Sequence, residues 1–299
     1  MTDFLEDTLS RFHPSRILAD PRATGEGVSV CIIDSGVERA MLEERFRQRG
    51  QEIKPIEGAL FALPSARRGS ADSARRGSPD PAAAPTEGLP SSTIRRPQTY
   101  EGHQSSPHGT TVADILLTVA PRIKLYSADV FGAQGACDVD TVIWALQWAV
   151  DEWKCKIINL SLGVAEHRLQ QVQKRYQFLR AIEDAYFKDV LVFAAAHNEH
   201  PLTLSYPAAF APALVSVDKH LFADPLQFAY QLRQQVEFQA HGRGYLGPLA
   251  AEPATSWAAP HLAGIAARIL SLRPGLKPFE IKTILYWISQ AASGPAGDV

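Results

Sequence analysis

Apolar residues along the chain form short unbroken runs that alternate with stretches of helical spacing. The run GVSVCIIDSGV at 27–37 is β-branched and ends in a turn that contains glycine, which is typical of a strand buried on both faces of a parallel sheet. The elements expected after it are a strand at 123–131, a helix at 138–153, a strand at 156–163, a helix at 169–187 and a strand at 190–198. This order predicts an α/β fold, a three-layer doubly wound and mainly parallel sheet with helices on both faces.

The composition fits one soluble domain that spans residues 1–299. Hydrophobic residues make up 45% of the chain and charged residues 21%, an ordinary balance for a globular protein with a sizeable core. Thirty basic side chains against 32 acidic ones give a formal charge of −2. Such a balance provides no broad field for nucleic acid or for an anionic membrane, so neither is an expected partner.

One tract interrupts the alternation of strands and helices. Residues 63–100 are rich in proline and arginine and contain SARRGS at 65–70 and again at 73–78. The tract has few apolar groups to offset the entropy of ordering it, so we expect a low-complexity, disordered insertion within the domain.

The cysteines and the N-terminus both predict a cytoplasmic protein. Cys31, Cys137 and Cys155 are odd in number and show no zinc-site spacing, so we expect reduced thiols. The first residues, MTDFLEDTLSRFHPSRILAD, lack the basic start and apolar stretch of a signal peptide. No apolar run reaches the ~18 residues that a membrane span requires.

Polar residues follow three of the expected strands. Asp34, Ser161 and Asn198 each stand where an apolar run ends. Because the carboxyl ends of parallel strands meet at one edge of the sheet, these residues are expected to gather there as a candidate site.

Two further residues stand at the start of expected helices. His108 precedes Gly109 and an apolar helix, and Ser256 lies among small residues in PATSWAAPHLAG. Taken alone, His108 fits a helix cap, Asp34 fits a turn after a strand, and the small residues around Ser256 fit close helix packing. Each residue alone is a moderate signal, and the three together point more strongly to a functional site.

The local sequences around these residues resemble the catalytic motifs of the subtilisin-like serine proteases, the subtilase family (peptidase S8). IIDSGV, HGTTVADIL and ATSWAAPHLAG occur in the family's order of Asp, His and Ser. Further segments that resemble this family are LYSADVFGAQG, IINLSLG, VLVFAAAHNE, YPAAFAPALVSV and LRPGLKPFEIKTIL. The resemblance therefore covers most of the chain outside the insertion.

The resemblance implies a serine endopeptidase with a catalytic triad and an oxyanion hole. Asp34 would orient His108, His108 would take the proton of Ser256, and Asn198 would donate to the oxyanion. The substrate would be an extended peptide or protein that adds a β-strand to residues 161–163. The residues that the resemblance assigns to substrate binding are Ser161, Leu162, Gly163, Ala195, Ala196, His197, Glu199 and Ser205.

Five positions depart from the family pattern. His197 and Ala254 replace glycines, Thr111 replaces a histidine, Asp114 replaces a glycine, and Trp257 replaces a smaller residue after the nucleophile. A side chain at 197 should narrow the pocket or swing outward, and a Cβ at 254 restricts the backbone. None of these departures removes a catalytic group.

We expect no cofactor and no required metal. Glu43 stands near the place of a calcium ligand in the family, but a calcium ion takes about six to eight oxygen ligands.

The segment before Asp34 suggests how activity is restrained. Residues 1–33 are too few for the folded pro-domain of secreted subtilases, so control is expected to come from narrow specificity, from a regulatory or inhibitory protein partner, or from an obstructing segment. The insertion at 63–100 is one candidate for such a segment.

Two other functions remain open on the sequence alone. A peptide cyclase or leader-processing enzyme would use the same triad, with an amine attacking the acyl-enzyme in place of water. A catalytically inactive peptide-binding relative would keep the fold and lose turnover. The mass of the products separates the first from hydrolysis, and a fluorophosphonate probe separates the second.

Overall fold

A computed structural model describes residues 19–61, 96–132 and 137–293, together with Arg16 and Gly135. Within these residues a nine-stranded sheet has the order β10-β11-β9-β7-β5-β1-β4-β2-β3. Its strands are β1 Ser29–Asp34, β2 Glu57–Leu60, β3 Gln98–Thr99, β4 Lys124–Asp129, β5 Ile157–Leu160, β7 Leu191–Ala195, β9 Val215–His220, β10 Phe228–Arg233 and β11 Val236–His241. All neighbours pair in parallel except the outermost pairs, β10 with β11 and β2 with β3.

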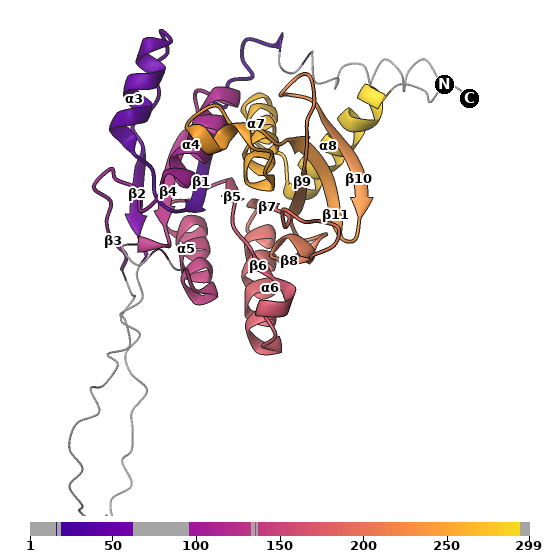
Figure 1. The fold of residues 1–299 in the computed structure, drawn as a ribbon. Helices are drawn as coiled ribbons and strands as arrows, with labels where there is room; N and C mark the ends of the chain where they lie inside the picture. The colour runs from indigo at the N-terminus through magenta and orange to yellow at the C-terminus, as the bar shows by residue number, and fades with distance from the viewer. Residues whose placement is uncertain (1–15, 17–18, 62–95, 133–134, 136, 294–299) are drawn as a thin grey trace, which may run out of the picture.

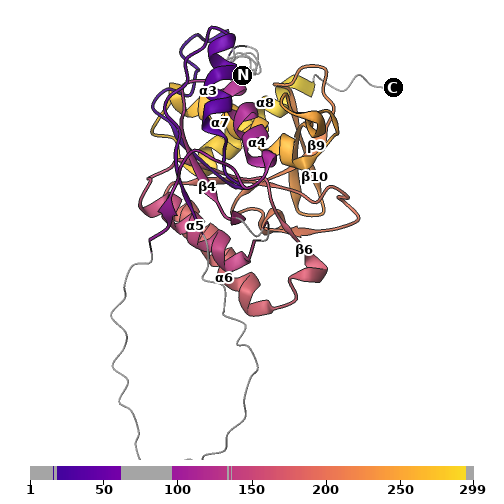
Figure 2. The ribbon, with the colours of Figure 1, turned by 60° about the vertical axis from the view of Figure 1, so that its left-hand side comes forward.

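Helices cover both faces of this sheet. They are α3 Arg39–Gln48, α4 Pro107–Val119, α5 Val139–Asp151, α6 Val172–Phe187, α7 Thr255–Leu272 and α8 Pro278–Ser293. Short 3-10 turns lie at Glu166–Arg168, Ala208–Phe210 and Pro248–Ala251, and β6 Val164–Ala165 pairs with β8 Ser205–Tyr206. Figures 1 and 2 show α5 and α6 on one side of the sheet and α4, α7 and α8 on the other. The expected doubly wound fold is confirmed.

The two faces explain the unbroken apolar run of β1. Val30 and Ile32 belong to the buried cluster with α4 and α7, whereas Cys31 and Ile33 belong to the cluster with α5 and α6. Successive side chains of a strand point to opposite faces, so a strand covered on both sides needs apolar residues at every position. None of the helices in the described ranges has the length and apolar character of a bilayer-spanning segment.

The sequence placed the end of the insertion too late. Residues 96–100 belong to the described structure, where β3 pairs antiparallel with β2 and Tyr100 donates to the carbonyl oxygen of Val37 at 2.5 Å. Two short strands can pair because each needs only a few residues in register with a neighbour. The rest of the expected insertion, residues 63–95, lies outside the described residues.

Shortening this segment is expected to stabilise the protein. Leu60 and Gln98 are register partners, so a tight connection can join the strands. Replacing residues 62–95 by a four-residue Gly/Ser linker should raise the free energy of unfolding by about 2 kcal/mol, because each halving of a loop saves about 0.6 kcal/mol of closure entropy. Urea unfolding of both forms measures the difference. A shortened variant that does not fold would show that the segment has a structural role.

Candidate active site

Three neighbouring strands bring the predicted polar residues to one edge of the sheet. β7, β5 and β1 are adjacent and parallel, and Asn198, Ser161 and Asp34 follow or end them. The helices α4 and α7, which carry His108 and Ser256, pack against each other on one face of the sheet. The structure therefore brings Asp34, Ser161 and Asn198 together at this edge, as expected.

Asp34 and His108 form a hydrogen-bonded pair. His108 Nδ1 lies 2.8 Å from Asp34 Oδ1 and 3.0 Å from Oδ2, and the carboxylate is almost completely buried. The Ser35 N–H also donates to Asp34 Oδ1 at 2.8 Å. Because Nδ1 donates to the carboxylate, Nε2 of neutral His108 is the nitrogen that can accept a proton.

The start of α4 allows this close approach. Ser106 is its N-cap, and its hydroxyl accepts from the His108 N–H at 3.4 Å, as small hydroxyl residues do at helix starts. A Cβ on Gly109 would lie 2.1 Å from the Gly36 carbonyl oxygen. Only glycine fits at 109, so the His-Gly sequence is a packing requirement of the Asp34–His108 pair.

Ser256 lies in the first turn of α7, where free N–H groups favour negative charge. Pro260 lies four residues further on inside the helix and has no N–H to donate to the Ser256 carbonyl. That carbonyl accepts instead from Ser161 Oγ at 2.8 Å, and Ser256 Oγ donates to the Ser161 carbonyl at 3.2 Å. The proline thus frees a backbone carbonyl that joins the turn of Ser256 to the end of β5.

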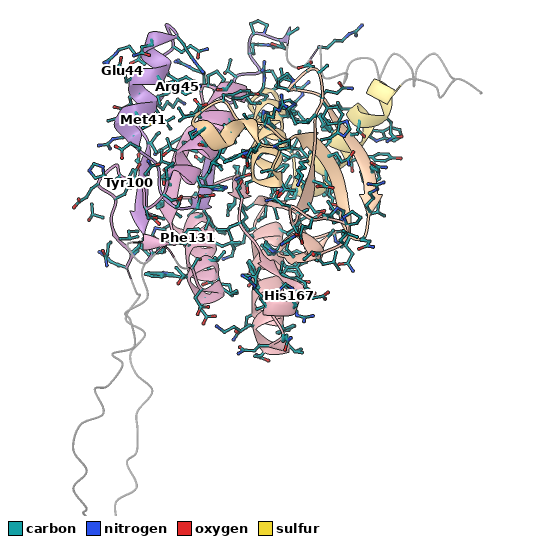
Figure 3. The ribbon with its side chains drawn as sticks, in the orientation of Figure 1. Met41, Glu44, Arg45, Tyr100, Phe131 and His167 are labelled. Carbon is teal, nitrogen blue, oxygen red and sulfur yellow. The ribbon has the colours of Figure 1, made fainter. Side chains whose placement is uncertain are left out.

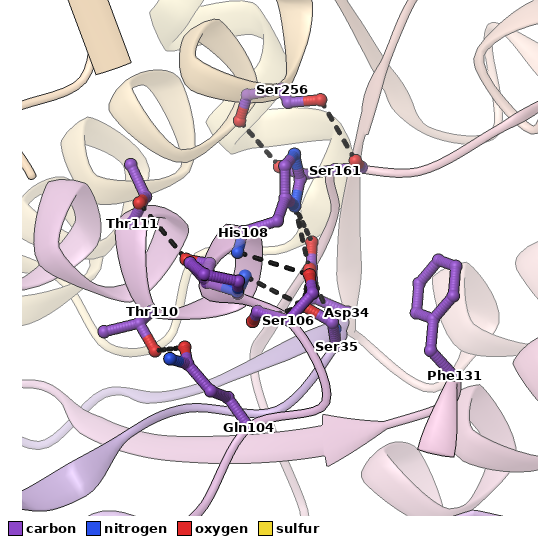
Figure 4. A network of polar contacts seen from close by, with 12 residues as sticks. Asp34, Ser35, Gln104, Ser106, His108, Thr110, Thr111, Phe131, Ser161 and Ser256 are labelled. Atoms are coloured by element: carbon purple, nitrogen blue, oxygen red, sulfur yellow. Dashed lines mark hydrogen bonds and ion pairs between the residues drawn. The ribbon is translucent and has the colours of Figure 1, made fainter. Parts of the chain in front are cut away.

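Figure 4 shows the His108 ring reaching from Asp34 toward Ser256. The ring of Trp257, the next residue after Ser256, lies 5.0 Å from the His108 ring between centroids. Among the described residues Ser256 Oγ bonds to Ser161 and not to His108. Catalytic hydrogen bonds often tighten only when substrate is bound, so the arrangement suits a serine nucleophile with a histidine base.

Asn198 is held by its amide oxygen, and none of the described residues bonds to its amide nitrogen. Its Oδ1 accepts from the Thr255 N–H at 2.9 Å and from Thr255 Oγ1 at 3.2 Å. Since only the oxygen of the amide can accept, this pairing fixes the orientation and leaves the Nδ2 protons available. Asn198 also lines a pocket together with Ser256, which is where an oxyanion donor is required.

The pocket has a volume of about 180 Å³. The expected substrate-binding residues that line it are Ser161, Leu162, Gly163, Ala195, Ala196, His197 and Ser205. Glu199 is the exception, because it is not part of the lining and its side chain is 71% exposed. His197 forms part of the wall, where its Nδ1 accepts from the Glu199 N–H at 3.2 Å.

Two departures from the family pattern join α4 to the segment that leads into α7. Asp114 is fully buried, and its Oδ1 lies 2.7 Å from Nε of Arg45 on α3 (Figure 3). The same guanidinium donates to the Tyr245 carbonyl at 2.7 Å, and Thr111 Oγ1 donates to the Leu246 carbonyl at 3.1 Å. Both side chains therefore have partners that suit them.

The other departures are also accommodated. Ala254 has φ −140° and ψ 148°, an extended conformation that any residue adopts. Trp257 is buried, its Nε1 donates to the Glu252 carbonyl at 3.1 Å, and its ring covers His108. Neither residue blocks the geometry of the site.

The environment of His108 sets the direction of its pKa. Burial lowers it, but the charge of Asp34 and the hydrogen bond to that carboxylate raise it more, so the pKa lies above its ordinary value of 6.5. A histidine base works only when neutral, so kcat/KM should rise with pH through a midpoint above 6.5 and then level off. Measuring kcat/KM between about pH 5 and 9 tests this, because histidine titrates within that range.

Asp34→Asn provides the control for this profile. The change removes the charge that raises the pKa of His108, so the rising limb should move to lower pH while the maximum falls by about 10⁴. A flat profile in the parent protein, or an unmoved limb in the variant, would contradict a histidine base held by Asp34.

The sequence did not point to several residues that support the site. Ser35 braces Asp34 and accepts from the Gly109 N–H at 3.1 Å, and Thr255 orients Asn198. Their signal was their place beside catalytic candidates within the quoted motifs. Within the described ranges no cluster of three or more His, Cys, Asp or Glu could hold a metal ion.

Sequence comparison finds similarity to one protease family. A model described as the subtilase family, Peptidase_S8, matches residues 25–219. M-protease from Shouchella clausii (strain KSM-K16) is 29% identical over 212 residues, which are 63% of this chain and 50% of that protein. Subtilisin Savinase from Lederbergia lenta is 29% identical over 212 residues, or 63% of this chain and 71% of that protein. The chain thus matches half the length of M-protease.

Solved structures share the fold. A lanthipeptide protease superimposes with a TM-score of 0.60 at 18% identity, covering 92% of this chain and 84% of its own. A cold adapted subtilisin-like serine proteinase does so with a TM-score of 0.55 at 20% identity, covering 87% and 81%. The family match covers Asp34, His108 and Asn198, and the structural matches extend the shared fold over most of the chain.

Proposed function

The chain belongs to the subtilase family of serine proteases, and from this premise we propose that it is an intracellular serine endopeptidase that acts through an acyl-enzyme at Ser256. The observation that carries the proposal is the arrangement at the sheet edge. The buried carboxylate of Asp34 holds the His108 ring on the side of Ser256 (Figure 4). Thr255 fixes the amide of Asn198 beside the pocket that Ser256 also lines. A nucleophile, a base and an oxyanion donor are the groups that acyl transfer requires.

The mechanism follows from the roles of these groups. Ser256 Oγ attacks the carbonyl carbon of the scissile bond while His108 Nε2 takes its proton, and Asp34 stabilises the imidazolium. The Ser256 N–H and Asn198 Nδ2 donate to the oxyanion. His108 then returns the proton to the leaving amine, and water releases the acyl group by the same steps.

The proposed substrate is an extended peptide or protein segment. Residues 161–163 line the pocket beside Ser256 and would pair with the backbone of such a segment as an added strand. The pocket of about 180 Å³ would take the side chain before the scissile bond. Neither a nucleic acid nor a membrane is part of the proposal.

The intracellular location and the regulation are further parts of the proposal. Cys31 and Cys155 are buried as free thiols, a usage typical of reducing compartments. Limited proteolysis of one partner protein, restrained by a regulatory partner, would suit a protease in such a compartment.

A second candidate is the processing of a modified precursor peptide. The likeness to a lanthipeptide protease, over 92% of this chain, favours it. A processing enzyme would use the same triad, and a cyclase would release a product one water lighter than hydrolysis does. An inactive peptide-binding relative is the remaining alternative.

Product analysis tests the proposed function. The purified protein is incubated with a library of unmodified peptides, and the products are sequenced by mass spectrometry beside those of Ser256→Ala protein. We expect new amino termini with parent protein only, each pair of products summing to substrate plus one water. Cyclic products would favour the cyclase. Binding of a peptide without formation of any product would favour the inactive relative.

A further inference from the structure

We propose that Lys219 is a positioning residue for Asn198 that orients and polarises its amide for the oxyanion. The inference rests on the proposed function and adds to it a residue that no catalytic motif contains. Lys219 is the fifth residue of β9, the strand beside β7, and Asn198 follows the end of β7.

The ammonium group of Lys219 contacts both oxygens of Asn198. Its Nζ lies 2.5 Å from the Asn198 carbonyl oxygen and 3.4 Å from Oδ1. Asn198 is exposed and lies three residues beyond the end of β7. The contact of Lys219 with its carbonyl oxygen fixes the turn that contains it. Thr255 holds Oδ1 from the other side. The amide is therefore held between two elements.

No carboxylate neutralises Lys219 in the part of the chain that the structure describes. The adjacent Asp218 is occupied, since its Oδ2 lies 3.0 Å from Nδ1 of His200. A cation that donates to an amide oxygen draws electron density from the amide, so the Nδ2 protons become stronger donors.

The strand next to β9 leaves room for this lysine. Gly242 follows β11, and a Cβ at that position would lie 2.7 Å from Cβ of Lys219. Gly242 also donates its N–H to the His220 carbonyl at 2.9 Å, which keeps the two segments close. The lysine side chain thus lies where a larger neighbour at 242 would displace it.

A double-mutant cycle separates positioning from a general structural effect. Lys219→Met should lower kcat by about tenfold and change KM by less than about twofold, because the lost interaction acts in the transition state. Lys219→Arg should keep most of the activity, since it keeps the charge and the donors. In an Asn198→Ala background, Lys219→Met should change kcat by less than about twofold. Lys156→Met, which removes an exposed charge before β5 at the opposite edge, is the control.

The results of this cycle test the positioning role of Lys219 separately from the proposed function. Full kcat in Lys219→Met, or an equal loss in both backgrounds at unchanged melting temperature, would overturn the positioning role while the proposed function stands. If Lys219→Met does not fold, Lys219→Gln takes its place in the cycle. A parent protein that cleaves no peptide would overturn the proposed function and this inference with it.

Discussion

Replacing Ser256 by alanine is expected to lower kcat by about 10⁶, the loss measured when the nucleophile is removed from subtilisin itself. Thr255, the other hydroxyl residue in the first turn of α7 that lines the pocket, donates its Oγ1 proton to the Ala196 carbonyl oxygen at 2.7 Å, so it is not free to replace Ser256. Hydrolysis of a generic chromogenic peptide measures the loss. Activity near that of the parent would contradict the role of Ser256.

The same variant should stay folded. Within the part of the chain that the structure describes, Ser256 Oγ makes one hydrogen bond, to the Ser161 carbonyl at 3.2 Å, and such a bond contributes about 0.5–1.5 kcal/mol net. For a chain of this size that corresponds to a change of only a few degrees in melting temperature. Ser271→Ala at the other end of α7 is the matched control, because Ser271 also makes hydrogen bonds but lies far along the helix from the site.

Replacing Asn198 by alanine is expected to lower kcat by about 10²–10³, the loss measured for the corresponding donor in subtilisin itself. Substrate binding should change little, because the Nδ2 protons face charge that develops only in the transition state. Asn198→Asp should be at least as inactive, since a carboxylate puts negative charge where the oxyanion forms.

Comparing kcat with KM distinguishes this role from substrate binding. Thr203→Ala, which removes a hydroxyl that donates to Glu199 Oε2 at 3.3 Å, is a control that alters the same loop without touching Ser256. A loss confined to KM in Asn198→Ala would show that Asn198 binds substrate and does not stabilise the oxyanion.

The central part of the fold could be predicted because its signals are local. The apolar run of β1 has a residue for each face of the sheet, and the helix of 138–153 keeps its apolar spacing in α5. α3 and β3 gave weaker signals. α3 is rich in arginine and glutamate and buries only Leu42 and Phe46, and β3 has two exposed residues. The formation of α3 and β3 depends on contacts with neighbouring elements, which sequence patterns do not show.

Some residues of the candidate site could also be predicted from the sequence, and others could not. Asp34, His108 and Ser256 could be found because each lies at the end of a regular element inside a motif. The supports of Asn198 could not, because Thr255 and Lys219 reach it from elements distant in sequence. Thr111 and Asp114 stood out only as departures from the family pattern, because the partners that accommodate them, Leu246 and Arg45, lie far from them in sequence.

Covalent labelling tests the central claim most directly. A fluorophosphonate reacts with a serine that a neighbouring base activates, and mass spectrometry of the digested protein locates the adduct. We predict a single adduct on Ser256 in the parent protein and none in Ser256→Ala or His108→Ala protein of unchanged melting temperature. An unlabelled parent protein, or an adduct on another residue, would contradict the assignment of Ser256 and His108 as nucleophile and base.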